Sequence, residues 1–195
     1  MEMCVIRDKL IDLLQSYDCK YPEEEVYKRQ IIDFIGFHSD CFERSCRLGH
    51  ITASSFVLNY DASRALLMHH TKLGIWLQLG GHCDGDSNVT AVALKEAQEE
   101  SGITAIKLLT ENIYDIDVHL VPANGDEQAH YHYDIRFLLQ VTDPDELVSK
   151  NSESMALKWF ENDVANLPTK QWSVVRLFEK WSNINIFSEF DKITT

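Results

Sequence analysis

Basic residues are scarce in this chain of 195 residues. Eighteen Lys and Arg stand against 31 Asp and Glu, which gives a formal net charge of -13 at pH 7. A surface of that sign repels phosphate backbones and anionic lipid, so we expect neither nucleic acid nor a membrane among its partners. An anionic small substrate is compatible with this charge only if cations or a local basic pocket attract it.

Two other features are missing from the sequence. No apolar run approaches the length that spans a bilayer, and residues 1–20 interrupt their hydrophobic residues with charges and contain no signal-peptide core. Five cysteines, an odd number spread thinly, exclude a disulfide framework and favour the reducing cytoplasm. Cys41, Cys46 and His50 would make an incomplete zinc site, because a fourth ligand is missing.

The hydrophobic content of 45% is enough to bury the core of one domain. Residues 1–46 carry apolar residues at helical spacing, whereas the rest of the chain has short β-type runs, a helix over residues 88–101 and a closing helix after Pro168. The expected strands are residues 51–60, 65–70, 75–79, 106–109, 113–120, 130–141 and 155–161. This order predicts an α/β (α+β) domain over residues 47–195, preceded by a helical extension.

The most informative pattern lies within residues 80–103. Glu96, Glu99 and Glu100 fall within an arc of about 100° on one face of the expected helix, near its C-terminus. Mutual repulsion and the helix dipole both disfavour this arrangement. A hard divalent cation, Mg²⁺ or Mn²⁺, would offset both penalties because it prefers carboxylate oxygens. The alternative is a solvated acidic helix end in which Lys95 pairs with Glu99.

This segment resembles the Nudix box, written G-x5-E-x7-R-E-U-x-E-E-x-G-U with U aliphatic. The matching positions hold Gly81, Glu96, Ala97, Glu99, Glu100, Gly102 and Ile103. Two positions depart from the pattern, because Ser87 stands at the first glutamate and Lys95 at the arginine. The match spans residues 81–103, and the surrounding strands and closing helix agree with the family's α/β/α sandwich, which is built on a mixed sheet.

The resemblance implies a hydrolase that cleaves a pyrophosphate bond in a nucleoside diphosphate linked to another moiety. Glu96, Glu99 and Glu100, with the Gly81 carbonyl, would bind Mg²⁺ or Mn²⁺, which would neutralise the diphosphate and lower the pKa of an attacking water. Metal would also draw an anionic substrate to an acidic protein. Many members take a general base from a loop before a late strand, which makes Glu153 the first candidate and Glu96 the second.

The two departures keep other interpretations open. Lys95 lacks the planar fork of arginine, and Ser87 removes a carboxylate that Asp84 or Asp86 would have to replace. A catalytically weak or inactive Nudix-fold module that binds a nucleotide for regulation fits the same sequence. An isoprenyl diphosphate isomerase of this fold is a third interpretation. Cys83, in the loop of the box, would then be the candidate for its catalytic acid.

Two strands carry a second polar face. Asp115, Asp117 and His119 alternate with apolar residues in one strand, as do His130, His132, Asp134 and Arg136 in another. A two-residue turn at Asn124-Gly125 would place His119 opposite His130 and Asp117 opposite His132. We expect this face to line the substrate cleft and to bind a further metal or phosphate; an ordinary solvent-facing sheet is the alternative.

The expected ligand is therefore a small nucleotide-type diphosphate. The candidate substrate-binding residues are Lys72, His82, His119, His130, His132 and Arg136. Residues 1–46 would cover the cleft or form a homodimer interface. The identity of the diphosphate is not encoded in the box.

Overall fold

The computed structural model describes residues 2–125, 128–145, 147–149, 151–152 and 154–183, with side chains from residue 7 onward. The helices in these ranges are α1 (Glu2–Ser16), α2 (Pro22–Phe37), α3 (Val89–Ser101) and α4 (Trp172–Ser182), with a 3-10 helix at Val164–Asn166. The strands are β1 (Gly49–Leu58), β2 (Arg64–His70), β3 (Trp76–Leu77), β4 (Leu79–His82), β5 (Ile106–Leu108), β6 (Asp115–Val121), β7 (His130–Val141) and β8 (Ser154–Glu161).

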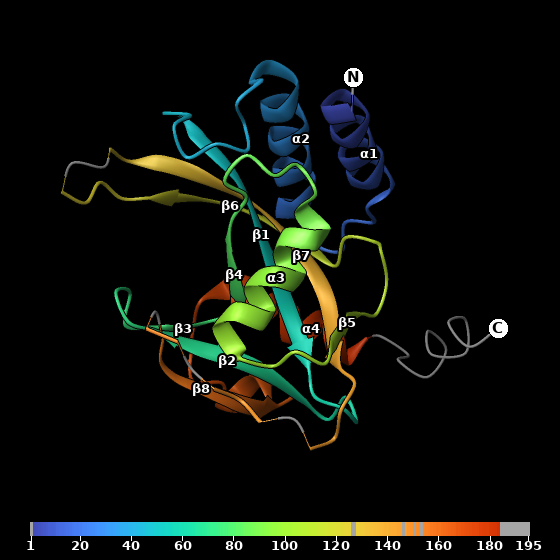
Figure 1. The fold of residues 1–195 in the computed structure, drawn as a ribbon, viewed down its shortest axis with the longest axis vertical. Helices are drawn as coiled ribbons and strands as arrows, with labels where there is room; N and C mark the ends of the chain where they lie inside the picture. The colour runs from blue at the N-terminus through green and yellow to red at the C-terminus, as the bar shows by residue number, and fades with distance from the viewer. Residues whose placement is uncertain (1, 126–127, 146, 150, 153, 184–195) are drawn as a thin grey trace.

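Strands β1 and β7 form the centre of one mixed sheet. They pair in parallel, from Gly49 opposite Tyr131 to Leu58 opposite Gln140. Each is long enough to take two further antiparallel partners. β4 flanks the middle of β1, and β6 flanks the first half of β7. β2 and β5 flank the last residues of β1 and β7. β3 and β8 pair with β2 and widen the far end of the sheet (Figure 1).

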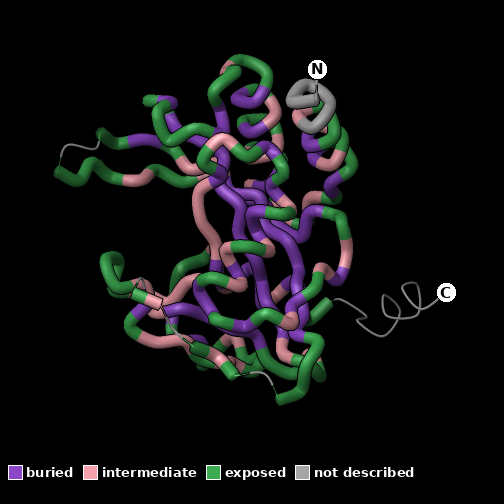
Figure 2. The backbone as a smooth tube through the Cα atoms, in the orientation of Figure 1, coloured by how far each residue is buried: buried purple, intermediate pink, exposed green. Residues whose placement is uncertain are grey.

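Helices cover both faces of this sheet. Because side chains alternate along β1, Ile51 and Ala53 join the core layer under α3, whereas Phe56 and Leu58 join the layer under α4. Figure 1 shows α3 in front of the central strands and α4 behind them. The central strands are the most buried part of the chain (Figure 2). The predicted α/β/α sandwich with a mixed sheet is confirmed.

The two N-terminal helices pack onto the same core layer as α3. Leu14 of α1 and Ile31 of α2 are fully buried in it, and the Phe34 ring stacks on Tyr133 of β7 with ring centroids 4.1 Å apart. Pro22 opens α2, because it lies in the first turn, where no backbone donor is required. Residues 1–46 therefore contribute hydrophobic side chains to the core that supports the box segment.

Most expected elements are present, with two differences. The strand expected over residues 75–79 is split at Gln78 into β3 and β4, because β3 pairs with β2 while β4 pairs with β1. The β6–β7 register is also different from the prediction. His119 lies opposite His132 and Asp117 opposite Asp134, and pairing stops at Val121 and His130, so the connection is longer than a two-residue turn. The slip is two residues, which leaves the same side chains on the same face.

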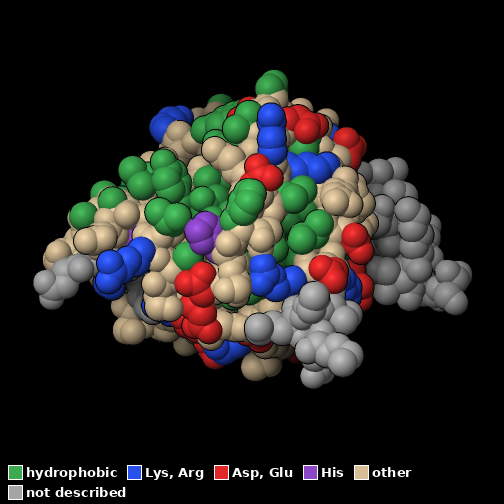
Figure 3. Space-filling view, turned by 90° about the horizontal axis from the view of Figure 1, so that it is seen from above, with side chains coloured by type: hydrophobic (Ala, Val, Ile, Leu, Met, Phe, Trp, Pro, Cys, Tyr) green, Lys and Arg blue, Asp and Glu red, His purple; other side chains and the backbone are tan. Residues whose placement is uncertain are grey.

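Charged side chains of both signs are scattered over the surface that Figure 3 shows, among hydrophobic ones. Within the described part of the chain, no helix combines the length and the apolar content needed to cross a bilayer.

Candidate active site

The box segment, residues 81–103, consists of the end of β4, a loop and helix α3. Asn88 caps the helix, because its side-chain oxygen accepts a hydrogen bond from the Ala91 N–H at 3.2 Å. Gly102 ends the helix in the left-handed conformation, with φ 71°, and its N–H donates to the Gln98 carbonyl. The local sequence thus fixes both ends of the helix that carries the three glutamates.

Two of these glutamates lie against β4. A Cβ atom at position 81 would collide with the Glu96 carboxylate, so glycine is what lets that carboxylate approach the strand backbone. Glu100 is only 2% exposed, and its Oε2 accepts a hydrogen bond from the Gly80 N–H at 2.8 Å. The Gly80-Gly81 backbone and two carboxylates therefore meet at one place.

The third glutamate points toward solvent. The Glu99 carboxylate is exposed and lies 3.8 Å from the Lys95 ammonium, which is the pair expected for a solvated helix end. Such an exposed pair contributes little free energy, so it does not oppose metal binding. The ligand atoms of Glu96, Glu99 and Glu100 do not all lie within 4.8 Å of one another. All are oxygens, however, and that donor set suits Mg²⁺ or Mn²⁺.

Residues 42–44 hold the loop of the box segment. The Arg44 guanidinium makes a two-pronged contact with Asp84, with Nη2 2.8 Å from Oδ2, and this ion pair lowers the pKa of Asp84. The Gly85 N–H donates to the Phe42 carbonyl at 3.0 Å. Ser87, at the position of the first box glutamate, is buried. Asp84, one of the two proposed replacements for that glutamate, is thus engaged by Arg44.

Four other expectations have different outcomes. Lys72 lies exposed in the turn after β2, a strand whose partners are β1, β3 and β8 rather than β4. Cys83 is buried, and burial raises the pKa of its thiol, so the thiol is protonated and withdrawn from solvent. Glu153 lies outside the described residues. The described Cys41, Cys46 and His50 do not form a group with ligand atoms within 4.8 Å.

A cluster of histidine rings occupies the second polar face, at the first residues of β1 and β7. The predicted His82, His119, His130 and His132 all belong to it, and β1 adds His50, which pattern reasoning had not placed there. The His50 centroid lies 4.9 Å from those of His82 and His130 and 4.8 Å from that of His132, and His119 lies 5.4 Å from His132.

Burial keeps two of these rings neutral. It lowers the pKa of His50 to about 4, with further contributions from His82 and His130. It lowers the pKa of His132 to about 2, again with repulsion from the surrounding histidines. Both imidazoles are therefore uncharged at neutral pH and have little attraction for a phosphate.

Arg136 was predicted to contact phosphate, and the structure contradicts this. The residue is 1% exposed, its Nε donates to Asp134 at 2.7 Å, and its Nη1 donates to Asp115 at 3.0 Å. Asp117 lies 3.4 Å from Nη2. Alternation placed the side chain on the correct face, but it did not reveal that α4 covers this part of the face.

Helix α4 supplies two more cations to the same buried group. Arg176 donates to both carboxylate oxygens of Asp115, at 3.0 and 2.9 Å, and Lys180 donates to Asp115 at 2.6 Å. Lys180 also pairs with the buried Glu24 of α2. Burial alone would raise the pKa of Asp115, but Arg136, Arg176 and Lys180 hold it below its usual value. This network joins α2, β6, β7 and α4.

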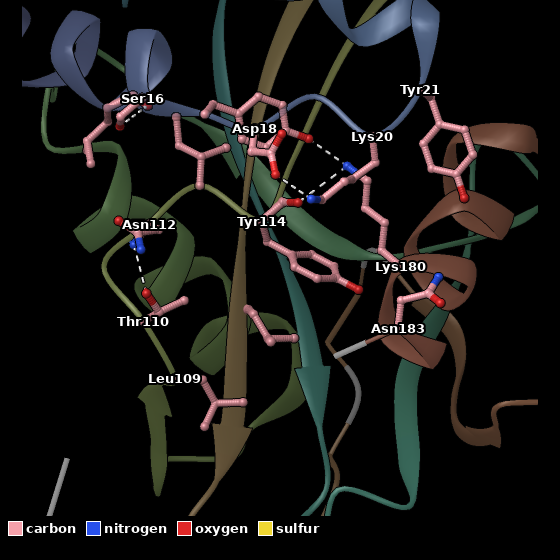
Figure 4. A pocket seen from close by; sticks show the side chains of 14 residues that line it. Ser16, Asp18, Lys20, Tyr21, Leu109, Thr110, Asn112, Tyr114, Lys180 and Asn183 are labelled. Carbon is pink, nitrogen blue, oxygen red and sulfur yellow. Dashed lines mark hydrogen bonds and ion pairs between the residues drawn. The ribbon is translucent and has the colours of Figure 1, made fainter. Parts of the chain in front are cut away.

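A cavity of about 960 Å³ lies beyond that network (Figure 4). Its walls come from the α1–α2 connection, the β5–β6 connection and the end of α4, and the labelled residues include Ser16, Lys20, Asn112, Tyr114 and Asn183. None of the predicted site residues lines it. The cavity is thus separate from the box segment.

Comparison with solved structures shows the same fold. A C. elegans Ap4A hydrolase in a binary complex has 20% identity and a TM-score of 0.55, covering 68% of this chain and 95% of that chain. A NUDIX-family hydrolase from Clostridium perfringens has 24% identity and a TM-score of 0.53, covering 69% and 97%. The E. coli dihydroneopterin triphosphate pyrophosphohydrolase has 16% identity and a TM-score of 0.55, covering 69% and 96%.

A search of curated proteins found no match. The family model of the NUDIX domain matches residues 49–181, which is more than half of the chain and includes the whole box segment. The chain therefore belongs to the NUDIX family.

Proposed function

We propose that this protein is a hydrolase, dependent on Mg²⁺ or Mn²⁺, that cleaves a pyrophosphate bond in a small nucleotide-type diphosphate. The observation that carries the proposal is the meeting of Glu96 and Glu100 with the Gly80-Gly81 backbone, in a chain of the NUDIX family. The free thiols of Cys19, Cys41, Cys46 and Cys83 support a reducing compartment, the cytoplasm.

The residues of the box segment have separate roles in this proposal. Glu96, Glu99 and Glu100, with the Gly81 carbonyl, hold the cation. When bound, the cation neutralises the diphosphate and lowers the pKa of a water molecule. Gly80 orients Glu100 through its N–H, and Arg44 orients the loop through Asp84.

The general base has two candidates. Glu96 lies within the described site, against the β4 backbone. Glu153 remains the candidate from the sequence. A base must receive the proton of the attacking water, directly or through one further water. The pH dependence of kcat for Glu153→Gln separates them. Loss of the acidic limb of the profile would identify Glu153 as the base, whereas a retained limb would leave that role to Glu96.

The proposal is tested by phosphate and nucleotide release from a panel of diphosphates. The panel contains nucleotide sugars, dinucleoside polyphosphates, oxidised nucleotides and coenzymes, each with Mg²⁺, Mn²⁺ or excess EDTA. We expect metal-dependent turnover of at least one compound, abolished by EDTA. Glu99→Gln should lower kcat by about 100-fold or more, because its exposed carboxylate has a role in holding metal but none in packing. Glu111→Gln, an exposed acid outside the box, is the matched control.

Absence of turnover with every compound and metal would contradict the proposal. If metal and nucleotide still bound in calorimetry, the chain would be the binding module that Ser87 and Lys95 left open. Equal activity of Glu99→Gln and Glu111→Gln would contradict the metal-binding role of Glu99.

A further inference from the structure

Three histidines at the start of β1 and β7 have their ring nitrogens within reach of one ion. One nitrogen each from His50, His130 and His132 lies within 4.8 Å of the other two. Parallel pairing of β1 and β7 puts His50 directly opposite His132, and His130 is two residues along the same face. Residues about 80 positions apart in the sequence are thus brought together by the central pair of the sheet.

His50 is the residue that demands an explanation. It is 2% exposed, and neither its Nδ1 nor its Nε2 has a hydrogen-bond partner. A neutral imidazole always carries one N–H donor and one acceptor, so a buried ring without partners loses the hydrogen bonds that water would give to both nitrogens. Its ring lies beside three other imidazoles, with centroids 4.8–4.9 Å away. A bound ligand that accepts nitrogen lone pairs would account for this arrangement.

The orientation of His130 is that of a metal ligand. Its Nδ1 lies 2.9 Å from the Gln128 carbonyl, which accepts the N–H and leaves a lone pair on Nε2. A backbone carbonyl on the second ring nitrogen is the usual support of a ligating histidine. The Nε2 atoms of His130 and His132 are 3.2 Å apart. Two nitrogen ligands of a tetrahedral zinc ion, each about 2.0–2.1 Å from the metal, lie about 3.3 Å from each other.

A hydrogen bond from His132 to His130 also fits that separation of 3.2 Å. It gives no partner to His50, however, which has two nitrogens to satisfy. A metal ion is the simpler explanation because it would satisfy all three rings at once. Neutral imidazoles are also the form that binds metal.

We propose that His50, His130 and His132 form a binding site for a first-row transition-metal ion, Zn²⁺ in the first place, separate from the cation site of the box segment. Imidazole nitrogen favours Zn²⁺ over Mg²⁺, whereas the box offers only oxygen. His82, whose ring lies 4.9 Å from that of His50 and 5.0 Å from that of His132, is the nearest residue for a fourth position. Water takes that position otherwise.

The two cation sites lie on opposite faces of β4. Gly81 and His82 are adjacent in the strand, so they point to opposite sides of the sheet. Position 81 faces Glu96 of α3, whereas the neighbouring position 80 faces Ser54 of β1. A metal ion bound by the histidines would link β1 to β7. If His82 were its fourth ligand, the ion would also link both strands to β4, which contains Gly81. The proposal does not depend on the proposed hydrolase activity.

The test is equilibrium dialysis of the full-length protein, first stripped with a chelator, against Zn²⁺ in the presence of excess Mg²⁺. We expect one Zn²⁺ per chain. His132→Gln should weaken this binding by at least about 100-fold, because removing even an indirect support of a ligand costs 10–100-fold. His69→Gln, a histidine of β2 outside the cluster, should bind as the wild type does. Glu99→Gln should also keep its Zn²⁺, which distinguishes this site from that of the box.

A second measurement does not need a variant. Co²⁺ in a tetrahedral site with nitrogen ligands absorbs visible light strongly, whereas hexaaqua Co²⁺ does not. The wild type loaded with Co²⁺ should therefore be coloured, and Zn²⁺ should abolish the colour. No zinc above background, or equal zinc affinity of wild type and folded His132→Gln, would overturn the site. Zinc lost in Glu99→Gln but kept in His132→Gln would assign it to the box instead.

Discussion

The Gly81 backbone and the Glu96 carboxylate lie in contact because residue 81 has no side chain. Gly81→Ala should lower kcat/KM by about 100-fold, since an added Cβ displaces the carboxylate, and small displacements of a positioned group have effects of this size. Substitution in this short strand should leave the fold intact. Steady-state kinetics on the best compound of the panel, with a urea unfolding curve, measures both quantities.

Gly36→Ala is the control at the same scale. Gly36 lies in the last turn of α2, and a Cβ there meets nothing within 4 Å. Alanine should raise the free energy of unfolding by about 0.5–1 kcal/mol, because it is the better helix former, and leave activity unchanged. Unchanged activity in Gly81→Ala would contradict the positioning role of that glycine.

Individual residues differ in how far the sequence reveals them. The box is local, so spacing alone predicted that Glu96, Glu99 and Glu100 share a helix face. His50 was missed as a member of the histidine cluster because its partner is set by parallel pairing with a strand about 80 residues away. Arg136 was assigned to the correct face, but its burial depends on α4, which follows it by some 35 residues.

At the scale of elements, periodicity predicts whether a segment is a helix or a strand and which side chains share a face. It predicts less well how the strands pair. A two-residue turn at Asn124-Gly125 predicts a β6–β7 register that is two residues out, because the connection runs from Val121 to His130. A slip of two preserves the faces, so the histidines and aspartates still lie on one side. Helix α3, with Asn88 before it and Gly102 after it, ends where its capping residues predict.

The start of α3 offers a stability test. Asn88→Ala removes the acceptor for the Ala91 N–H, so we expect the free energy of unfolding to fall by about 1 kcal/mol. Asn88→Asp retains an acceptor at the same position and should lose far less. Urea unfolding at pH 7 compares the two variants. An equal loss in both would show that the cap hydrogen bond is not the source of the effect.

At the scale of the whole molecule, buried charge connects helices from the two ends of the chain. Glu24 of α2 and Asp115 of β6 share Lys180 of α4, and Asp115 also receives Arg176 and Arg136. Glu24 lies in the first turn of α2, where an acidic side chain suits the helix dipole. Its burial follows from the closing helix, whose position against residues 1–46 is a long-range property of the fold.

This network predicts the response to acid. The three cations hold the pKa of Asp115 below its usual value, so the carboxylate stabilises the folded state at pH 7. That contribution is lost as the pH falls below the unfolded-state pKa of about 3.9, because the unfolded chain then binds a proton that the folded chain resists.

Asp115→Asn removes the carboxylate that the three buried cations share, so we expect it to lower the free energy of unfolding by about 3–5 kcal/mol at pH 7. The difference from wild type should shrink at pH 3. Asp33→Asn, an exposed site on α2, should change stability by less than about 0.5 kcal/mol at either pH. Urea unfolding at both pH values measures this, and a difference for Asp115→Asn that stays constant with pH would mean that the Asp115 charge is not what stabilises the fold.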